Sequence, residues 1–184
     1  MVKNIIASLA ATGAAALALS PALADEHAAP SDPPHVAVVD ASGAQVGTLV
    51  LQETPAGVLI AANVTGLPPG EHGFHLHEKG ICDPAEGFTT SGGHYAPRSN
   101  SHGFKEAAGP HAGDMPNQFA DGEGTLRAHV LNPFVTMGPG VATLNDADGT
   151  ALVIHEGKDD YTSQPSGAAG KRLACAVIAA PKEM

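Results

Sequence analysis

Short apolar runs that alternate with polar residues recur along the chain, and turn-forming residues separate them. The separating segments include Pro68-Pro69-Gly70 and Asp146-Ala147-Asp148-Gly149, which are typical of tight turns. Helical periodicity is almost absent. The runs predict strands at 35–39, 45–52, 57–64, 73–78, 124–131, 141–145, 151–155 and 172–180. The pattern predicts an all-β fold, an eight-stranded antiparallel Greek-key barrel or sandwich with two long functional loops.

The first 24 residues look like a secretory signal peptide. Lys3 is followed by an apolar Ala/Leu/Ile run and by Ala22-Leu23-Ala24, a pattern typical of a cleavage site. An uncleaved membrane anchor is the alternative, but the segment is short and rich in small residues. We expect a mobile N-terminal tail over 25–34 and one domain over 35–184, in a periplasmic or secreted protein.

The charge of the chain restricts its partners. The formal net charge is -10, and removal of Lys3 with a leader that has no acidic residue makes it -11. Such an acidic protein is poorly suited to bind nucleic acid or an anionic membrane surface. We therefore expect neither as a partner after signal cleavage.

Two histidines lie one residue apart in the run Gly73-Phe74-His75-Leu76-His77-Glu78. Successive side chains of a strand point to opposite faces, so His75 and His77 share a face while Phe74 and Leu76 share the other. One face can enter a core while the other presents two nitrogen donors. The spacing predicts part of a metal site, and a strand with two exposed histidines is the alternative.

A second group of potential ligands lies in a segment from Asp83 to Asp121, which is rich in Gly, Pro, Ser and Asn and shows no strand or helix periodicity. We predict a long loop without secondary structure, which is unusual unless something organises it. His94, His102, His111 and Asp114 are by type and number a closed tetrahedral zinc set of the structural kind. A disordered polar loop is the alternative.

A further histidine ends the apolar run Ala151-Leu152-Val153-Ile154-His155. His155 can act as a third strand-borne donor beside His75 and His77, and an all-imidazole site suits copper as well as zinc. A loop histidine that also reached this group would contact two metals, which requires deprotonation of both ring nitrogens.

Cys82 and Cys175 are the only cysteines of the chain. An even pair in an exported protein normally forms a disulfide, which here would attach the start of the ligand-bearing loop to the last strand. Two metal-ligating thiolates are a weak alternative, because no second cysteine lies near either one.

Taken together, these segments resemble the bacterial copper,zinc superoxide dismutases. The matching segments are 73–77, 93–97, 101–103, 109–114, 153–156 and 170–175, and the resemblance extends from about His35 to the end of the chain. The resemblance implies one copper and one zinc per subunit, and it implies the disulfide between the two cysteines.

The resemblance also assigns roles to individual residues. It places copper on His75, His77, His94 and His155, zinc on His94, His102, His111 and Asp114, and makes His94 the bridging imidazolate. It implies that Asp159 links a copper-ligand ring to a zinc-ligand ring, as outer carboxylates do. It implies that Arg172 is the active-site cation, a planar donor group suited to a small anion.

The implied activity is that of an oxidoreductase, in which copper cycles between two oxidation states and converts superoxide to dioxygen and hydrogen peroxide while zinc is structural. A non-catalytic copper chaperone or buffer is one alternative, although such a protein can lose ligands or Arg172, and this chain retains them. A structural β-sandwich that zinc only stabilises would need no histidines on its strands. A blue-copper electron carrier would need a cysteine ligand to the copper. The expected partners are superoxide as substrate and, as one option, a second copy in a homodimer.

One feature of the tail is not supplied by the resemblance. If cleavage follows Ala24, the mature chain begins Asp25-Glu26-His27, with a free amine, two amides and an imidazole. Four nitrogens in a plane suit copper(II) or nickel(II). We therefore expect a second, N-terminal copper site there.

Overall fold

The computed structural model describes residues 33–183. The expected signal peptide, most of the expected tail and the expected copper site at Asp25-Glu26-His27 lie outside the described residues.

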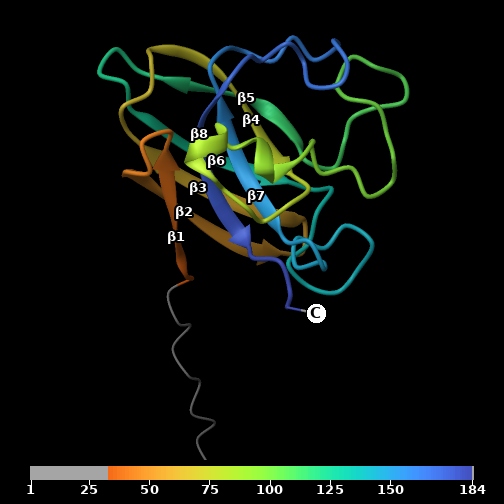
Figure 1. Ribbon diagram of the computed structural model, residues 1–184. Helices are drawn as coiled ribbons and strands as arrows, with labels where there is room; N and C mark the ends of the chain where they lie inside the picture. The colour runs from red at the N-terminus through yellow and green to blue at the C-terminus, as the bar shows by residue number, and fades with distance from the viewer. Residues whose placement is uncertain (1–32, 184) are drawn as a thin grey trace, which may run out of the picture. The chain divides into compact units, whose positions relative to one another are not determined.

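Eight antiparallel strands form a closed barrel, which confirms the predicted fold class (Figure 1). Their order around the barrel is β1-β2-β3-β6-β5-β4-β7-β8, so the chain crosses between non-neighbouring strands, as in a Greek key. The strands are β1 (His35–Asp40), β2 (Gln45–Thr54), β3 (Gly57–Val64), β4 (Gly70–His77), β5 (Asp114–Ala120), β6 (Leu126–Asn132), β7 (Thr150–His155) and β8 (Arg172–Ala179).

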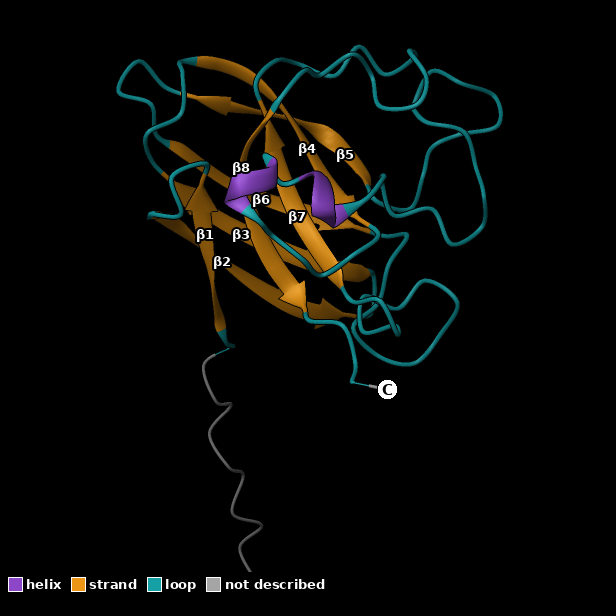
Figure 2. Ribbon diagram, viewed as in Figure 1, coloured by secondary structure: helices purple, strands orange, loops and turns teal. Residues whose placement is uncertain are grey.

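Helical structure among the described residues is limited to two single-turn 3-10 helices, η1 (Pro84–Glu86) and η2 (Thr89–Ser91) (Figure 2). Neither is long enough to cross a membrane, and no other helix is found in this part of the chain.

Two details of the predicted strands are wrong. Residues 141–145 are not a strand and contribute only an isolated bridge between Thr136 and Thr143. The strand β5 was missed, and the segment 83–121 is not without secondary structure, since it contains β5, η1 and η2. The sequence of β5, Asp-Met-Pro-Asn-Gln-Phe-Ala, hides its strand character because its hydrogen-bond partners come from β4, about forty residues earlier in the chain.

The predicted alternation of β4 is confirmed. Phe74 and Leu76 are fully buried in the main core inside the barrel, where they are joined by Leu152 and Ile154 from the paired strand β7. The opposite faces of β7 and β8 carry a second, smaller core of Ala151, Val153, Cys175 and Phe88. Strands β4 and β7 are therefore buried on both faces, and histidines that they carry are held in a rigid frame.

The segment that follows β4 is attached to this second core. Cys82 and Cys175 form a disulfide with 5.8 Å between their Cα atoms, as predicted. Phe88, which lies just before η2, is 0% exposed and packs with Cys175 and Val153. The two 3-10 helices thus lie against the outer face of β7 and β8 (Figure 2).

Two long loops extend from the same side of the barrel (Figure 1), and we call 92–113 the first loop and 156–171 the second loop. The loops contact each other directly, since the amide of Lys105 donates to the carbonyl of Tyr161 at 3.1 Å. Residues from both loops and from β4 and β7 meet where the loops cover the strands.

Candidate metal centre

Seven residues from the strands and the first loop gather into two overlapping groups. One group is His75, His77, His94 and His155, and the other is His94, His102, His111 and Asp114. Within each group the potential ligand atoms all lie within 4.8 Å of one another, and every member is buried or nearly so. The structure brings together all seven residues that the resemblance assigned to copper and zinc, and His94 belongs to both groups.

The all-histidine group is built on paired strands. His75 and His77 project from β4, and β7 contributes His155 at its end. The Nε2 atoms of His77 and His155 are 3.4 Å apart. The first loop returns over this face and forms an isolated bridge between His94 and His77, which brings the His94 ring to 4.1 Å from the His75 ring, centroid to centroid.

The second group is organised around the carboxylate of Asp114, at the first position of β5. Its Oδ1 accepts from Nδ1 of His94 at 2.8 Å, and Nδ1 of His111 lies 3.3 Å from the same oxygen. Its Oδ2 lies 3.1 Å from Nδ1 of His102 and accepts from the backbone amide of Gly103 at 2.9 Å. Three imidazoles and one carboxylate thus lie close together in a largely buried position.

Asp159, in the second loop, connects the two groups. Its Oδ2 lies 2.9 Å from Nε2 of His75, and its Oδ1 lies 3.0 Å from Nε2 of His102. A carboxylate accepts, so both Nε2 atoms carry hydrogens, and in the neutral form of each ring Nδ1 is the nitrogen with the free lone pair. One side chain thereby sets the tautomer of a ring in each group.

The unpartnered atoms test whether metal ions fit these groups. Four buried imidazole nitrogens have no hydrogen-bond partner, namely Nδ1 of His75, Nε2 of His94, Nδ1 of His102 and Nδ1 of His111. Unpartnered buried polar atoms are costly and rare, and all four point into the two groups. Neutral imidazole nitrogens suit copper and zinc, and the three-histidine, one-carboxylate set suits tetrahedral zinc. The donor sets therefore fit both metals.

Burial keeps three rings of the all-histidine group neutral. It lowers the pKa of His94 to about 4 and that of His155 to about 3, and nearby imidazoles reinforce the shift. Burial also holds the pKa of His77 well below its usual range. Imidazole must be neutral to bind a metal, so these three rings are ready to do so at neutral pH.

The carboxylates have the opposite effect on the second group. Burial alone would lower the pKa of His102, but the nearby carboxylates of Asp114 and Asp159 outweigh it and raise that pKa to about 9. Burial opposes ionisation of Asp114 as well, yet the adjacent rings of His102, His111 and His94 hold its pKa far below the usual range. A metal entering this group must therefore displace a proton from His102.

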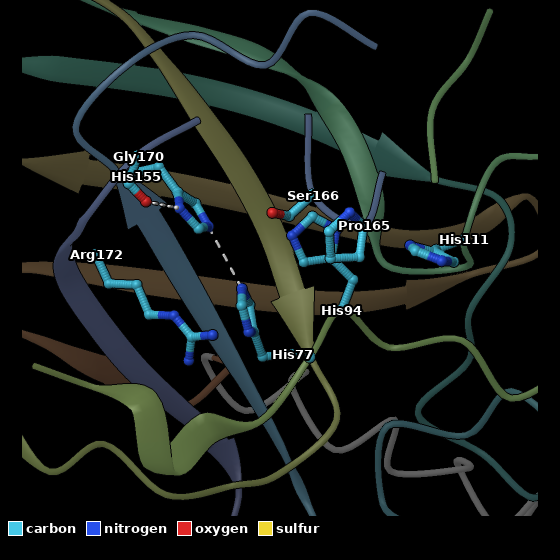
Figure 3. A pocket seen from close by; sticks show the side chains of 9 residues that line it. His77, His94, His111, His155, Pro165, Ser166, Gly170 and Arg172 are labelled. Carbon is cyan, nitrogen blue, oxygen red and sulfur yellow. Dashed lines mark hydrogen bonds between the residues drawn. The ribbon is translucent and has the colours of Figure 1, made fainter. Parts of the chain in front are cut away.

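A cavity of about 330 Å³ gives access to the all-histidine group (Figure 3). Figure 3 shows His77, His155 and Arg172 at one end of this cavity and His111 at the other, with His94 between them. Pro165 and Ser166 of the second loop complete its lining, together with Gly93 and Gly170.

Arg172, the first residue of β8, is held by the chain around η2. Its Nη1 donates to the carbonyl of Phe88 at 2.7 Å and to Oγ of Ser91 at 2.8 Å, and its Nη2 donates to the carbonyl of Gly92 at 2.8 Å. The carbonyl of Gly92 also lies 3.0 Å from Nδ1 of His77. The guanidinium and a ring of the all-histidine group thus share one anchoring carbonyl.

Several residues that hold the site were not singled out from the sequence. Asn117 of β5 pairs with the backbone of Asp159, its Nδ2 donating to the carbonyl and its Oδ1 accepting from the amide, each at 2.8 Å. Gln164 of the second loop makes the same kind of pair with the backbone of His102, at 2.8 and 3.0 Å. Single polar residues in turn-rich segments carry no local signal of such distant partners.

Gly167 marks a close approach between the two loops. Its φ is +70°, and a Cβ there would overlap the carboxylate of Asp159 and lie 2.7 Å from Nε2 of His102. Only glycine combines this backbone conformation with the absence of a side chain. The space that Gly167 leaves free is occupied by the Asp159 carboxylate.

Comparison with known proteins gives a consistent family. A family model for copper/zinc superoxide dismutase matches residues 45–178. The chain is 49% identical over 146 residues to superoxide dismutase (Cu-Zn) 2 of Aquifex aeolicus, covering 78% of this chain and 85% of that protein. It is 40% identical over 146 residues to superoxide dismutase (Cu-Zn) of Caulobacter vibrioides, covering 77% of this chain and 83% of that one.

Solved structures are similar over the same region. The Cu/Zn superoxide dismutase from Brucella abortus matches with a TM-score of 0.65 and 31% identity, covering 79% of this chain and 98% of that chain. A SOD-like protein from Bacillus subtilis matches with a TM-score of 0.74 and 35% identity, covering 78% and 97%.

Proposed function

The chain belongs to the copper/zinc superoxide dismutase family, and from this membership we propose how its residues divide the reaction between two metal sites. The protein is a superoxide dismutase, which converts superoxide to dioxygen and hydrogen peroxide. The observation that carries the assignment of its residues is the pair of buried ligand groups that share His94 and leave four imidazole nitrogens unpartnered.

The all-histidine group would hold copper, and the group with Asp114 would hold zinc. Copper, when bound, supplies one-electron oxidation and reduction, which zinc cannot supply. Two features support this division. Three of the four members of the all-histidine group line the cavity together with Arg172, whereas His102 and Asp114 do not line it, and the group with Asp114 is a set of three imidazoles and one carboxylate that is typical of structural zinc.

His94 is the residue that would move a proton. Its Nδ1 faces Asp114 in the zinc group and its Nε2 faces the copper group, so the ring can be held from one side while Nε2 gains or loses a proton. A buried imidazole with a low pKa releases its proton readily to a reduced oxygen species.

Arg172 would bind the substrate anion. Three of its five N–H groups are occupied by Phe88, Ser91 and Gly92, which leaves Nε–H and one Nη2–H. Arg172 is half-buried and lines the cavity beside His77. A permanently charged donor pair at this position suits a small diatomic anion.

The test is metal analysis of the purified protein combined with a superoxide-consumption assay. We expect one copper and one zinc per chain and rapid consumption of superoxide. His155→Ala should lose most of this activity, and the matched control is His129→Ala, which removes an exposed histidine from the outer face of β6. A His155→Ala protein as active as the control would contradict the assigned copper group.

We also propose that the protein is periplasmic or secreted and works outside the cytoplasm. The Cys82–Cys175 disulfide supports this, because such bonds persist in oxidising compartments. Cell fractionation of the native host would test the location, and an exclusively cytoplasmic protein would contradict it. Assembly into a homodimer stays a prediction, which sedimentation velocity would test.

A further inference from the structure

The side chain of Ser91 contacts Arg172, the residue that would bind the substrate anion. The function described above gives Ser91 no role of its own. Ser91 is the last residue of η2 and is 0% exposed. Its hydroxyl donates to the carbonyl of Phe88 at 2.9 Å and accepts from Nη1 of Arg172 at 2.8 Å. Because a serine has a single hydrogen to donate, the bond to Phe88 orients its lone pairs toward Arg172.

This hydroxyl determines which guanidinium hydrogens remain available. Nη1 of Arg172 is bonded to the carbonyl of Phe88 as well as to Ser91, so both of its hydrogens are used. The guanidinium hydrogens that remain available to bind an anion are then the one on Nε and one of the two on Nη2. Without the hydroxyl, one Nη1 hydrogen would lack an acceptor, and the planar group would be held only by the carbonyls of Phe88 and Gly92, which restrict its orientation less.

We propose that Ser91 is a positioning residue, whose buried hydroxyl holds the Arg172 guanidinium in the orientation that binds the substrate anion. This inference rests on the proposed role of Arg172. The hydroxyl contacts neither the substrate nor a metal ligand, and its effect is exerted through the arginine alone.

The chain offers a matched control on the same single-turn helix. Thr89 makes the same local bond as Ser91, its Oγ1 donating to the carbonyl three residues earlier, Glu86, at 2.8 Å. Thr89 is exposed and does not contact Arg172. Thr89→Ala therefore removes a hydroxyl from η2 and its bond to the carbonyl three residues earlier, without disturbing the guanidinium.

The experiment compares Ser91→Ala, Thr89→Ala, Arg172→Ile and the double variant Ser91→Ala/Arg172→Ile, all loaded with copper and zinc. Azide serves as an anion probe, and its dissociation constant is measured from its absorption band with copper(II), independently of turnover. Metal content and thermal midpoint are measured for each protein.

We expect Ser91→Ala to keep its copper and to bind azide about three- to tenfold more weakly, the range for loss of one hydrogen bond. Thr89→Ala should match the wild type. In the Arg172→Ile background, Ser91→Ala should have no further effect, because the residue it positions is gone.

Two results would overturn the proposal for Ser91 and leave Arg172 in its role. The first is an unchanged azide affinity in Ser91→Ala while Arg172→Ile is weakened. The second is any sign that the hydroxyl acts on something other than Arg172. Such a sign would be a loss of copper from Ser91→Ala, or an effect of Ser91→Ala that persists in the Arg172→Ile background. An Arg172→Ile protein that binds azide and turns over superoxide normally would instead overturn the role of Arg172.

Discussion

At the scale of single residues, the site depends on which nitrogen of each imidazole is left free. Asp159 binds Nε2 of both His75 and His102, so Nδ1 is free in each ring. His77 is bound at Nδ1 instead, by the carbonyl of Gly92 at 3.0 Å, so its Nε2 faces the copper group. Each of these three rings is thus oriented by a residue that is not itself a proposed metal ligand.

The guanidinium of Arg172 supplies the first prediction. Arg172→Ile should leave metal content intact but lower superoxide turnover about tenfold at low ionic strength, because a local anion guide has been removed. The dependence of turnover on salt should weaken as well, since screening acts on that charge. Turnover measured across a series of ionic strengths tests this.

A suitable control is Arg127→Ile, which removes one positive charge from the exposed face of β6, outside the cavity. Its turnover should stay within about twofold of the wild type, since exposed charges at a distance are largely screened. Equal turnover of Arg172→Ile and wild type at low salt would count against the assignment.

At the scale of elements, strands and loops contribute different parts of the centre. The strands β4 and β7 carry three histidines of the copper group and are buried on both faces. The zinc group draws His94, His102 and His111 from the first loop and is completed by Asp114 at the start of β5. Loss of a zinc ligand should therefore release the first loop, whereas loss of a strand-borne copper ligand should leave the frame intact.

The second prediction follows from this division. Asp114→Ala or His102→Ala, even with saturating zinc, should lower the thermal midpoint by about 5 °C or more, because closed zinc sites contribute folding energy. Activity per bound copper should fall less. His155→Ala should show the reverse, with low activity and a small change in midpoint.

Calorimetry of the metal-loaded proteins, with a superoxide assay normalised to copper, makes the comparison. Glu123→Ala removes an exposed carboxylate in the turn between β5 and β6 and should behave as the wild type. Equal thermal midpoints for wild type and Asp114→Ala in saturating zinc would rule out the stabilising role of the zinc group.

At the scale of the whole molecule, the segment that leads from β4 to the first loop is attached to the outside of the closed barrel. The disulfide joins Cys82, just after β4, to Cys175 in β8, across 93 positions of the sequence. Phe88 and Arg172 attach the same segment to β7 and β8 by packing and hydrogen bonds. The path from β4 to the first loop is therefore held at both a covalent and a noncovalent point.

The third prediction concerns this covalent attachment. Closing a loop of this length should stabilise the fold by about 4 to 5 kcal/mol in the chain-entropy model. The double variant Cys82→Ala/Cys175→Ala should lose a free energy of unfolding of that order when unfolded by denaturant in metal-free form. Wild type treated with a thiol reductant provides the comparison, and a loss below about 1 kcal/mol in both would show that the denatured chain is not restricted by the bond.

Local patterns in the sequence determined much of this protein. The alternation of His75 and His77 with Phe74 and Leu76 was sufficient to place donors on one face and core residues on the other, because successive strand side chains point to opposite faces. The types and number of the loop ligands were sufficient to predict a zinc set, and the resemblance to a known family assigned the residues to two metals.

Only the tertiary structure revealed several of the contacts that orient the residues of the site. Asn117 reaches the backbone of Asp159 across 42 positions, and Arg172 reaches Ser91 across 81. The strand β5 was missed because a proline and polar residues interrupt the alternation of its apolar residues, while its partners lie in β4 and, at Ala120, in β6. Local patterns depend on neighbours in the chain, whereas these contacts arise only when the barrel closes and brings distant segments together.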